Sequence, residues 1–170
     1  MKNAATTVLG LAVLAGCALF GDERLPAPPE TPTFDTAVVP GQRIGAVALG
    51  MSGAQLLQAV GSPRMSNHAT DVTRAEFLNG VEVIVRDSDN RVSSASTTDS
   101  RYATAAGLRV GSSEFEVRTF HGHPANEIPE AGAGHYLCYP GVWFGISPGS
   151  NRVHTIGIAP GKGCPTTARR

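Results

Sequence analysis

Three cysteines carry the most reactive side chains of this chain of 170 residues. Cys17 ends an apolar N-terminal stretch, whereas Cys138 and Cys164 both lie near the C-terminus. The thiols of exported domains usually pair, because their compartment is oxidising. We therefore predict a disulfide between Cys138 and Cys164. The alternative is that one of these two thiols is reactive or binds a metal.

The other candidates for chemistry are histidines, serines and carboxylates. His121, His123 and His135 are close in sequence, but no cysteine or carboxylate stands at a familiar zinc-ligand spacing from them. The serines lack the G-x-S-x-G pattern of a hydrolase nucleophile. No glycine-rich phosphate-binding loop is found either, because Gly107-x-x-x-Gly111 lacks the Lys-Ser/Thr that should follow it. We therefore expect no catalytic residue, no metal and no cofactor, and we predict that the protein is not an enzyme.

The N-terminus has the pattern of a targeting segment. Residues 4–15, AATTVLGLAVLA, follow a single lysine and are too short to span a membrane as a helix. The run ends in Leu14-Ala15-Gly16-Cys17, which resembles the lipobox of bacterial lipoproteins. This resemblance implies lipidation of Cys17, cleavage before it and acylation of the new N-terminus. The alternative is an ordinary secretory signal with an incidental cysteine.

We accordingly expect a lipoprotein signal peptide over residues 1–16 and a proline-rich tether over 17–40. Five prolines in the tether favour extended structure and forbid a helix. Acyl chains on Cys17 would anchor the protein to a membrane without a transmembrane helix. Ala18 stands where an aspartate favours inner-membrane retention in enterobacterial lipoproteins, which indicates the outer membrane, facing the periplasm.

The balance of charge argues against one class of partner. Lys and Arg number 14 and Asp and Glu also number 14, so the chain has no basic surface for nucleic acid. A hydrophobic content of 41% is compatible with a packed core, and 20 glycines with 12 prolines indicate many turns and short elements.

A sequence motif that occurs twice, here called the frame, indicates the secondary structure around these residues. Residues 50–63 (GMSGAQLLQAVGSP) and 111–124 (GSSEFEVRTFHGHP) share Gly, Ser, Gly and Pro at the same four places, offset by 111 − 50 = 61. In each, Ser followed three residues later by Gln or Glu is a helix capping box, and the second Gly with the following Pro ends the helix. Matches at Gly80-Val81 and Asn90-Arg91-Val92 keep this offset without a gap.

The repeat predicts an α+β fold of two tandem units, over 41–99 and 100–160, with a tail over 161–170. Each unit is expected to be a short helix, or a helical hairpin, on a three-stranded antiparallel meander. The strands are expected at 72–78, 81–86 and 91–97 in the first unit, and at 136–139, 142–146 and 152–158 in the second. Alternating Val81, Val83 and Val85 show the period of a half-buried strand.

The first unit resembles the BamE (SmpA/OmlA) family of outer-membrane lipoproteins. The resemblance rests on Gly50-Met51-Ser52, Gln55-Leu56 and Val60-Gly61-Ser62-Pro63, together with the lipobox. It implies a small noncatalytic subunit of the machinery that assembles outer-membrane β-barrels, acting through protein and lipid contacts. The tandem arrangement also looks like that of the β-lactamase inhibitory proteins, whose two units present a joint sheet surface to an enzyme.

Departures from the repeat supply candidates for a binding site. At the offset of 61, Trp143 replaces Glu82 and Cys138 replaces Phe77. If Val142 and Phe144 face the helix, Trp143 faces the other side of the sheet, with Tyr136 and Tyr139 on the neighbouring strand. We predict that these three aromatic residues anchor a partner. The alternative is that Trp143 packs in the joint between the two units.

Together these features predict a noncatalytic, membrane-anchored lipoprotein of the bacterial envelope. It is expected to act through contacts with an envelope protein, as an accessory factor in outer-membrane protein assembly or envelope integrity. The alternative function is a tethered periplasmic inhibitor or binder of a hydrolase. Its membrane contact is expected through the lipid on Cys17, and no nucleic-acid partner is expected.

Overall fold

A computed structural model describes residues 35–130, 134–161, 163 and 164. The predictions for the signal peptide, Cys17 and nearly all of the tether therefore lie outside the described residues, as do those for most of the tail. In the described part, neither helix is long and apolar enough to cross a membrane.

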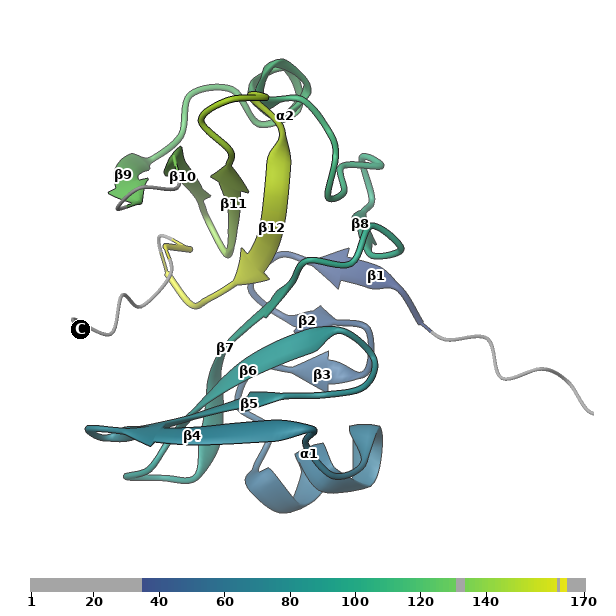
Figure 1. The fold of residues 1–170 in the computed structure, drawn as a ribbon, viewed down its shortest axis with the longest axis vertical. Coiled ribbons are helices and arrows are strands. Elements are labelled where there is room, and N and C mark those ends of the chain that lie inside the picture. Colours follow the sequence, from purple (N-terminus) through teal and green to yellow (C-terminus); the bar gives the residue numbers. More distant parts are fainter. Residues whose placement is uncertain (1–34, 131–133, 162, 165–170) are drawn as a thin grey trace, which may run out of the picture. The chain divides into compact units, whose positions relative to one another are not determined.

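Strands dominate the described chain, and only two short helices accompany them there (Figure 1). The helices are α1 (Gly53–Val60) and α2 (Glu114–His121). In the first half of the chain the strands are β1 (Ala37–Val39), β2 (Arg43–Ile44), β3 (Val47–Ala48), β4 (Met65–Ala69), β5 (Val72–Glu76), β6 (Val81–Arg86) and β7 (Arg91–Thr97). In the second half they are β8 (Ala103–Thr104), β9 (Asn126–Glu130), β10 (Gly134–Tyr139), β11 (Val142–Ile146) and β12 (Val153–Ile158).

These strands form two sheets. The larger has eight strands in the order β4-β5-β6-β7-β12-β11-β10-β9, all antiparallel to their neighbours. The smaller has four strands in the order β3-β2-β1-β8, in which β1 and β8 run parallel. Pairing of β7 with β12 makes one continuous sheet from the two halves of the chain, as Figure 1 shows.

The predicted α+β fold of two tandem three-stranded units is therefore wrong. Each half contributes a four-stranded meander, because β4 and β9 precede the three strands that the sequence indicated. All residues of β4 are exposed, and β9 (NEIPE) is polar and contains a proline. Edge strands of this kind lack the apolar alternation by which a strand is detected. The second sheet, built from two- and three-residue strands, was also not predicted.

The core lies on the inner face of the large sheet. Val81, Val83 and Val85 point into it from β6, as their alternation predicts. Each helix adds one buried residue, Leu56 from α1 and Val117 from α2. Buried residues of the small sheet and of both meanders belong to a single hydrophobic cluster. The two halves thus share one core, which neither would bury alone.

Both helices begin and end as the frame predicts. Ser52 caps α1 and forms a capping box with Gln55, while Ser113 and Glu116 do the same for α2. After the helices, Gly61 and Gly122 adopt φ of 81° and 74°, a backbone conformation that favours glycine.

A pseudo-twofold axis relates the two halves. Nη1 of Arg91 donates to the carbonyl of Gly50 over 2.6 Å, and Nη1 of Arg152 donates to that of Gly111 over 2.7 Å. Where β7 meets β12, Ser96 pairs with Gly157, which is its own equivalent because 157 − 96 = 61. The axis therefore passes through this pair of residues.

The register of the hairpins corrects the predicted match of Cys138 with Phe77. The backbone N–H of Phe77 donates to the carbonyl of Val81, whereas Val142, the equivalent of Val81, pairs with Tyr139. Tyr139 is thus the equivalent of Phe77, and Cys138 is the equivalent of Glu76. Between β9 and β10 the second half has one residue more than the first, and between Tyr139 and Val142 it has one fewer than the first half has between Phe77 and Val81. The extra residue and the missing residue cancel. Identical residues further along the chain therefore still match at the offset of 61, and the sequence alone does not reveal the two changes.

Candidate functional site

Trp143, predicted as an exposed anchor, is buried: only 6% of its surface is exposed. Its indole lies over Gly157, where a side chain would collide with the ring. The ring of Tyr136 meets it edge-on, with centroids 5.2 Å apart. The prediction of Trp143 as a partner anchor is therefore wrong. The indole instead packs beside the Ser96–Gly157 pair, where the two halves join.

Tyr136 is half-buried and belongs to a closed polar cluster on the same face. Its hydroxyl donates to one carboxylate oxygen of Glu130, and the other oxygen lies 3.2 Å from Nε2 of His154. Burial, with the hydrogen bond and charge of Glu130, raises the pKa of Tyr136 well above its usual range. At the equivalent place in the first half, Arg74 and Glu82 form an ion pair at 3.4 Å.

Tyr139 lies on the opposite face from Tyr136, inside the core. It is 2% exposed, and its hydroxyl donates to the carbonyl of Gly122 over 3.2 Å. The ring of His121 stacks against it at 4.8 Å, and burial lowers the pKa of His121. Residues 136 and 139 are an odd number of positions apart, so strand alternation already places them on opposite faces. The predicted trio of Trp143, Tyr136 and Tyr139 does not form a single surface.

The predicted disulfide between Cys138 and Cys164 is present, with the two Cα atoms 5.0 Å apart. It connects β10 to the segment that follows β12. In this segment Gly163 lies against the backbone of Tyr139 and Val142, so close that a side chain would not fit. The hairpin of the second half is thus covered by chain that the disulfide holds in place.

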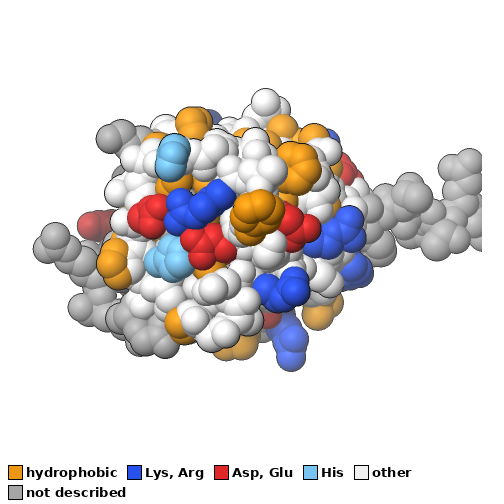
Figure 2. Space-filling view, turned by 90° about the horizontal axis from the view of Figure 1, so that it is seen from above, with side chains coloured by type: hydrophobic (Ala, Val, Ile, Leu, Met, Phe, Trp, Pro, Cys, Tyr) orange, Lys and Arg blue, Asp and Glu red, His pale blue; other side chains and the backbone are white. Residues whose placement is uncertain are grey.

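The surface around α2 carries charged and histidine side chains between hydrophobic ones, as Figure 2 shows for the end of the molecule seen from above. Arg118 binds Glu114 at 2.8 Å and Glu127 at 2.9 Å, and Nε2 of His135 lies 3.4 Å from Glu114. Over the described ranges, no group of three His, Cys, Asp or Glu side chains is placed to hold a metal.

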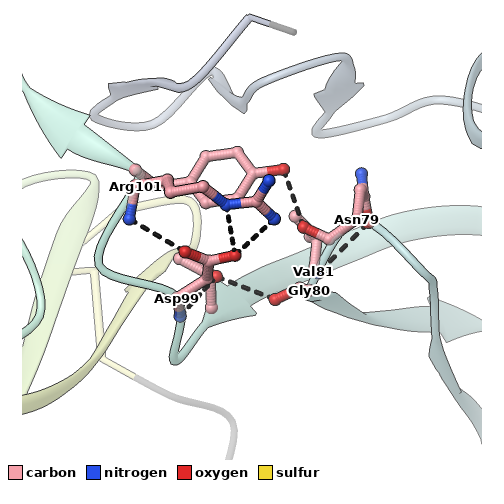
Figure 3. Close-up of polar contacts among 7 residues, drawn as sticks. Asn79, Gly80, Val81, Asp99 and Arg101 are labelled. Carbon is pink, nitrogen blue, oxygen red and sulfur yellow. Dashed lines mark hydrogen bonds and ion pairs between the residues drawn. The ribbon is translucent and has the colours of Figure 1, made fainter.

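The hairpin of the first half presents a different surface. Leu78 follows β5 in the turn to β6 and is 82% exposed, the most exposed large hydrophobic residue of the described chain. Several hydrogen bonds fix the turn (Figure 3). The N–H of Gly80 donates to Phe77 O over 3.1 Å, and the N–H of Val81 donates to Oδ1 of Asn79 over 3.2 Å.

Neighbouring segments also hold this turn. The hydroxyl of Tyr102 donates to the carbonyl of Asn79 over 3.0 Å, and that of Thr97 donates to the carbonyl of Gly80 over 2.8 Å. Asp99 accepts from Nε of Arg101 at 2.8 Å and from Nη2 at 2.6 Å, and these side-chain bonds lower the pKa of Asp99 (Figure 3). Leu78 therefore projects from a turn that is fixed on several sides.

A pocket of ≈ 300 Å³ opens beside this turn. Its walls come from the end of α1, the turn itself, the segment after β7 and the start of the small sheet. The lining residues are Asp35, Thr36, Ala46, Ala59, Val60, Leu78, Asn79, Arg101 and Tyr102.

Sequence reasoning missed this site. The strand predicted at 72–78 ends at Leu78, although Asn79-Gly80, a strong hairpin signal, follows it directly. The remaining walls come from segments far apart in sequence, so no local pattern reveals the pocket. The candidate site is therefore the pocket with Leu78 at its mouth.

No protein-family model and no curated protein matches the chain. A solved structure of an extracellular protein containing a SCP domain, from Bacillus anthracis str. Ames, aligns with a TM-score of 0.47 and 10% identity. A cysteine-rich secretory protein from Staphylococcus aureus subsp. aureus Mu50 aligns with a TM-score of 0.44 and 13% identity. Each alignment covers 66% of this chain and 44% of the other, so the chain spans less than half the length of these proteins.

These findings correct the predicted family. No family model matches the chain, that of BamE included, and the described residues form an eight-stranded and a four-stranded sheet rather than two tandem helix-and-meander units. The resemblance to the BamE family, and the architectural one to the β-lactamase inhibitory proteins, are therefore withdrawn. The helix frame that suggested them specifies a capped helix and nothing more.

Proposed function

We propose that this chain is an exported, noncatalytic binding protein that contacts a protein partner with Leu78 and the adjoining pocket. The observation that carries the proposal is the 82% exposure of Leu78 on a turn held by hydrogen bonds. Burial of this side chain by a partner would remove apolar surface from water. A rigid turn loses little conformational freedom on binding, so more of that gain appears as affinity.

The polar clusters of the described chain support a binding role rather than catalysis. Both carboxylate oxygens of Glu130 are engaged, with Tyr136 and His154. Arg118 is engaged with Glu114 and Glu127, away from the pocket. Groups satisfied by one another in this way are typical of ion pairs that stabilise a surface.

The proposed location is the bacterial cell envelope, on the outer membrane facing the periplasm, with a lipid anchor on Cys17. The disulfide between Cys138 and Cys164 supports an oxidising compartment outside the cytoplasm. The signal-like residues 1–16 and the Leu14-Ala15-Gly16-Cys17 pattern support export and anchoring.

Site-specific photo-crosslinking in intact cells tests this function. A photoreactive phenylalanine analogue at position 78 is expected to capture a defined envelope protein, and the same analogue at Met65 is the control. Met65 is 57% exposed but lies on β4, outside the pocket. The captured protein is then purified, and Leu78→Asp is expected to weaken its binding at least about tenfold.

Equal capture at positions 78 and 65, or unchanged affinity of Leu78→Asp, would contradict the proposal. The identity of the partner separates the two functional alternatives. A factor of outer-membrane protein assembly would support an accessory role, and a hydrolase would support an inhibitor or binder of that enzyme.

A further inference from the structure

The C-terminal ends of α1 and α2 differ, and the difference indicates which kind of group the pocket binds. Ala59 and Val60 of α1 line the pocket, and their equivalents at the offset of 61 are Phe120 and His121. In the second half the ring of His121 stacks on Tyr139, whose hydroxyl donates to Gly122 O. There, two aromatic rings fill the space between the helix end and the hairpin.

In the first half the equivalent residues leave that space less filled. Val60 is smaller than His121, and Phe77, the equivalent of Tyr139, is fully buried and has no hydroxyl. The pocket of ≈ 300 Å³ at this place is large enough for a ring, since a cavity of about 150 Å³ already binds benzene.

The walls of the pocket are suited to an aromatic ring with a polar group. Tyr102 lines the pocket but is only 3% exposed, and its own hydroxyl is already used by the carbonyl of Asn79. Arg101 lines the pocket with its guanidinium fixed by Asp99, and guanidinium planes stack on aromatic faces. Oδ1 of Asn79 accepts from Val81, which leaves the amide nitrogen to donate to a ligand oxygen.

We propose that the pocket binds the phenol ring of a tyrosine side chain of the partner protein. This inference rests on the proposed function and specifies its contact. The partner tyrosine takes the place that the ring of His121 occupies in the second half, beside Phe77, the equivalent of Tyr139. The hydroxyl of this tyrosine accepts a hydrogen bond from the side-chain amide nitrogen of Asn79. Leu78 then packs against the partner's backbone next to the tyrosine.

Binding of p-cresol, the side chain of tyrosine, tests this contact in the whole protein. In a two-dimensional amide NMR titration, p-cresol is expected to shift the signals of Val60, Leu78 and Arg101 with a Kd on the order of 1 mM. 4-Methylcyclohexanol has a similar shape but no aromatic face, and it should bind roughly three- to tenfold more weakly. Equal binding of the two compounds, or no saturable shift with p-cresol, would overturn the inference.

Variants locate the binding to the pocket. Val60→Phe and Ala59→Phe each fill it from α1 and are expected to weaken p-cresol binding at least about tenfold. The matched control is Ala54→Phe on the same helix, at the exposed position where the second half has Phe115, which is 79% exposed. This control should bind p-cresol like the unmodified protein. If all three variants bind it equally well, the site lies elsewhere and the inference fails.

The two proposals fail separately. If p-cresol does not bind while Leu78→Asp still weakens the partner, the partner contact stands and the tyrosine inference is overturned. If p-cresol binds but Leu78→Asp leaves partner affinity unchanged, the proposed function fails, and with it the role of a partner tyrosine.

Discussion

At the scale of the residue, the position of Trp143 depends on the lack of a side chain at Gly157. The indole lies directly over this glycine, so that any Cβ there would overlap the ring. Gly157 does not need glycine for its backbone, because its φ lies outside the left-handed region. Only the space taken by the indole therefore requires glycine at position 157. The equivalent residue of the first half, where no indole lies, is Ser96.

Gly157→Ala is accordingly expected to displace the indole. Overpacking of this kind lowers the free energy of unfolding by about 1–3 kcal/mol. Chemical denaturation monitored by tryptophan fluorescence measures it, because Trp143 is the only tryptophan. Gly149→Ala is the matched control, since a Cβ at Gly149 meets nothing within 4 Å. Equal stability of the two variants would show that the ring can move aside at no cost.

At the scale of the element, what the sequence predicted well was determined locally. Ser52 with Gln55, and Ser113 with Glu116, define their helices within four residues, and both capping boxes are present. Strand β4 has no buried residue, so its presence depends on pairing with β5 and leaves no apolar pattern. The exposure of Leu78 depends on Tyr102 and Thr97, which bind the turn from distant segments.

The disulfide is the element-scale feature with the largest expected effect on stability. Cys138 and Cys164 are 26 residues apart, and closing a loop of this length restricts the unfolded chain by about 3 kcal/mol. The variant with both Cys138→Ser and Cys164→Ser is expected to lose about this much free energy of unfolding in urea. Reductant should lower the stability of the unmodified protein to a similar extent and leave the variant unchanged.

Direct labelling checks the bond itself. In the denatured but unreduced protein, an alkylating reagent should leave Cys138 and Cys164 unmodified. Labelling of both residues would contradict the pairing.

At the scale of the whole molecule, the sequence revealed the repeat but not how the two copies combine. Matching caps and turns at the offset of 61 indicate two similar halves, yet nothing local shows that β7 and β12 pair across them. The residue inserted before β10 and the one lost after it are invisible in the aligned sequence, although they move Cys138 from the place of Phe77 to that of Glu76. Strand register of this kind is set by tertiary pairing.

Anchoring also concerns the molecule as a whole. Cys17→Ser removes the thiol that the lipobox-like pattern predicts to be acylated. The variant is expected to lose labelling by a fatty-acid analogue and to move from the membrane to the soluble fraction. Ser62→Ala, within residues 50–63 and far from the lipobox-like pattern in sequence, serves as the control and should remain at the membrane. Unchanged labelling of Cys17→Ser would favour an ordinary secretory signal.

The pairing of Ser96 with Gly157 has a consequence for how such a sheet keeps from aggregating. A strand that pairs with its own equivalent across a twofold axis makes the same contact as two identical subunits in an isologous dimer. A single half would leave β7 as an open edge, ready to recruit another copy. Joining the two halves in one chain satisfies that edge permanently and at any concentration. Within the described chain, the large sheet ends at β4 and β9. Strand β9 contains a proline, which has no N–H to donate to an added strand.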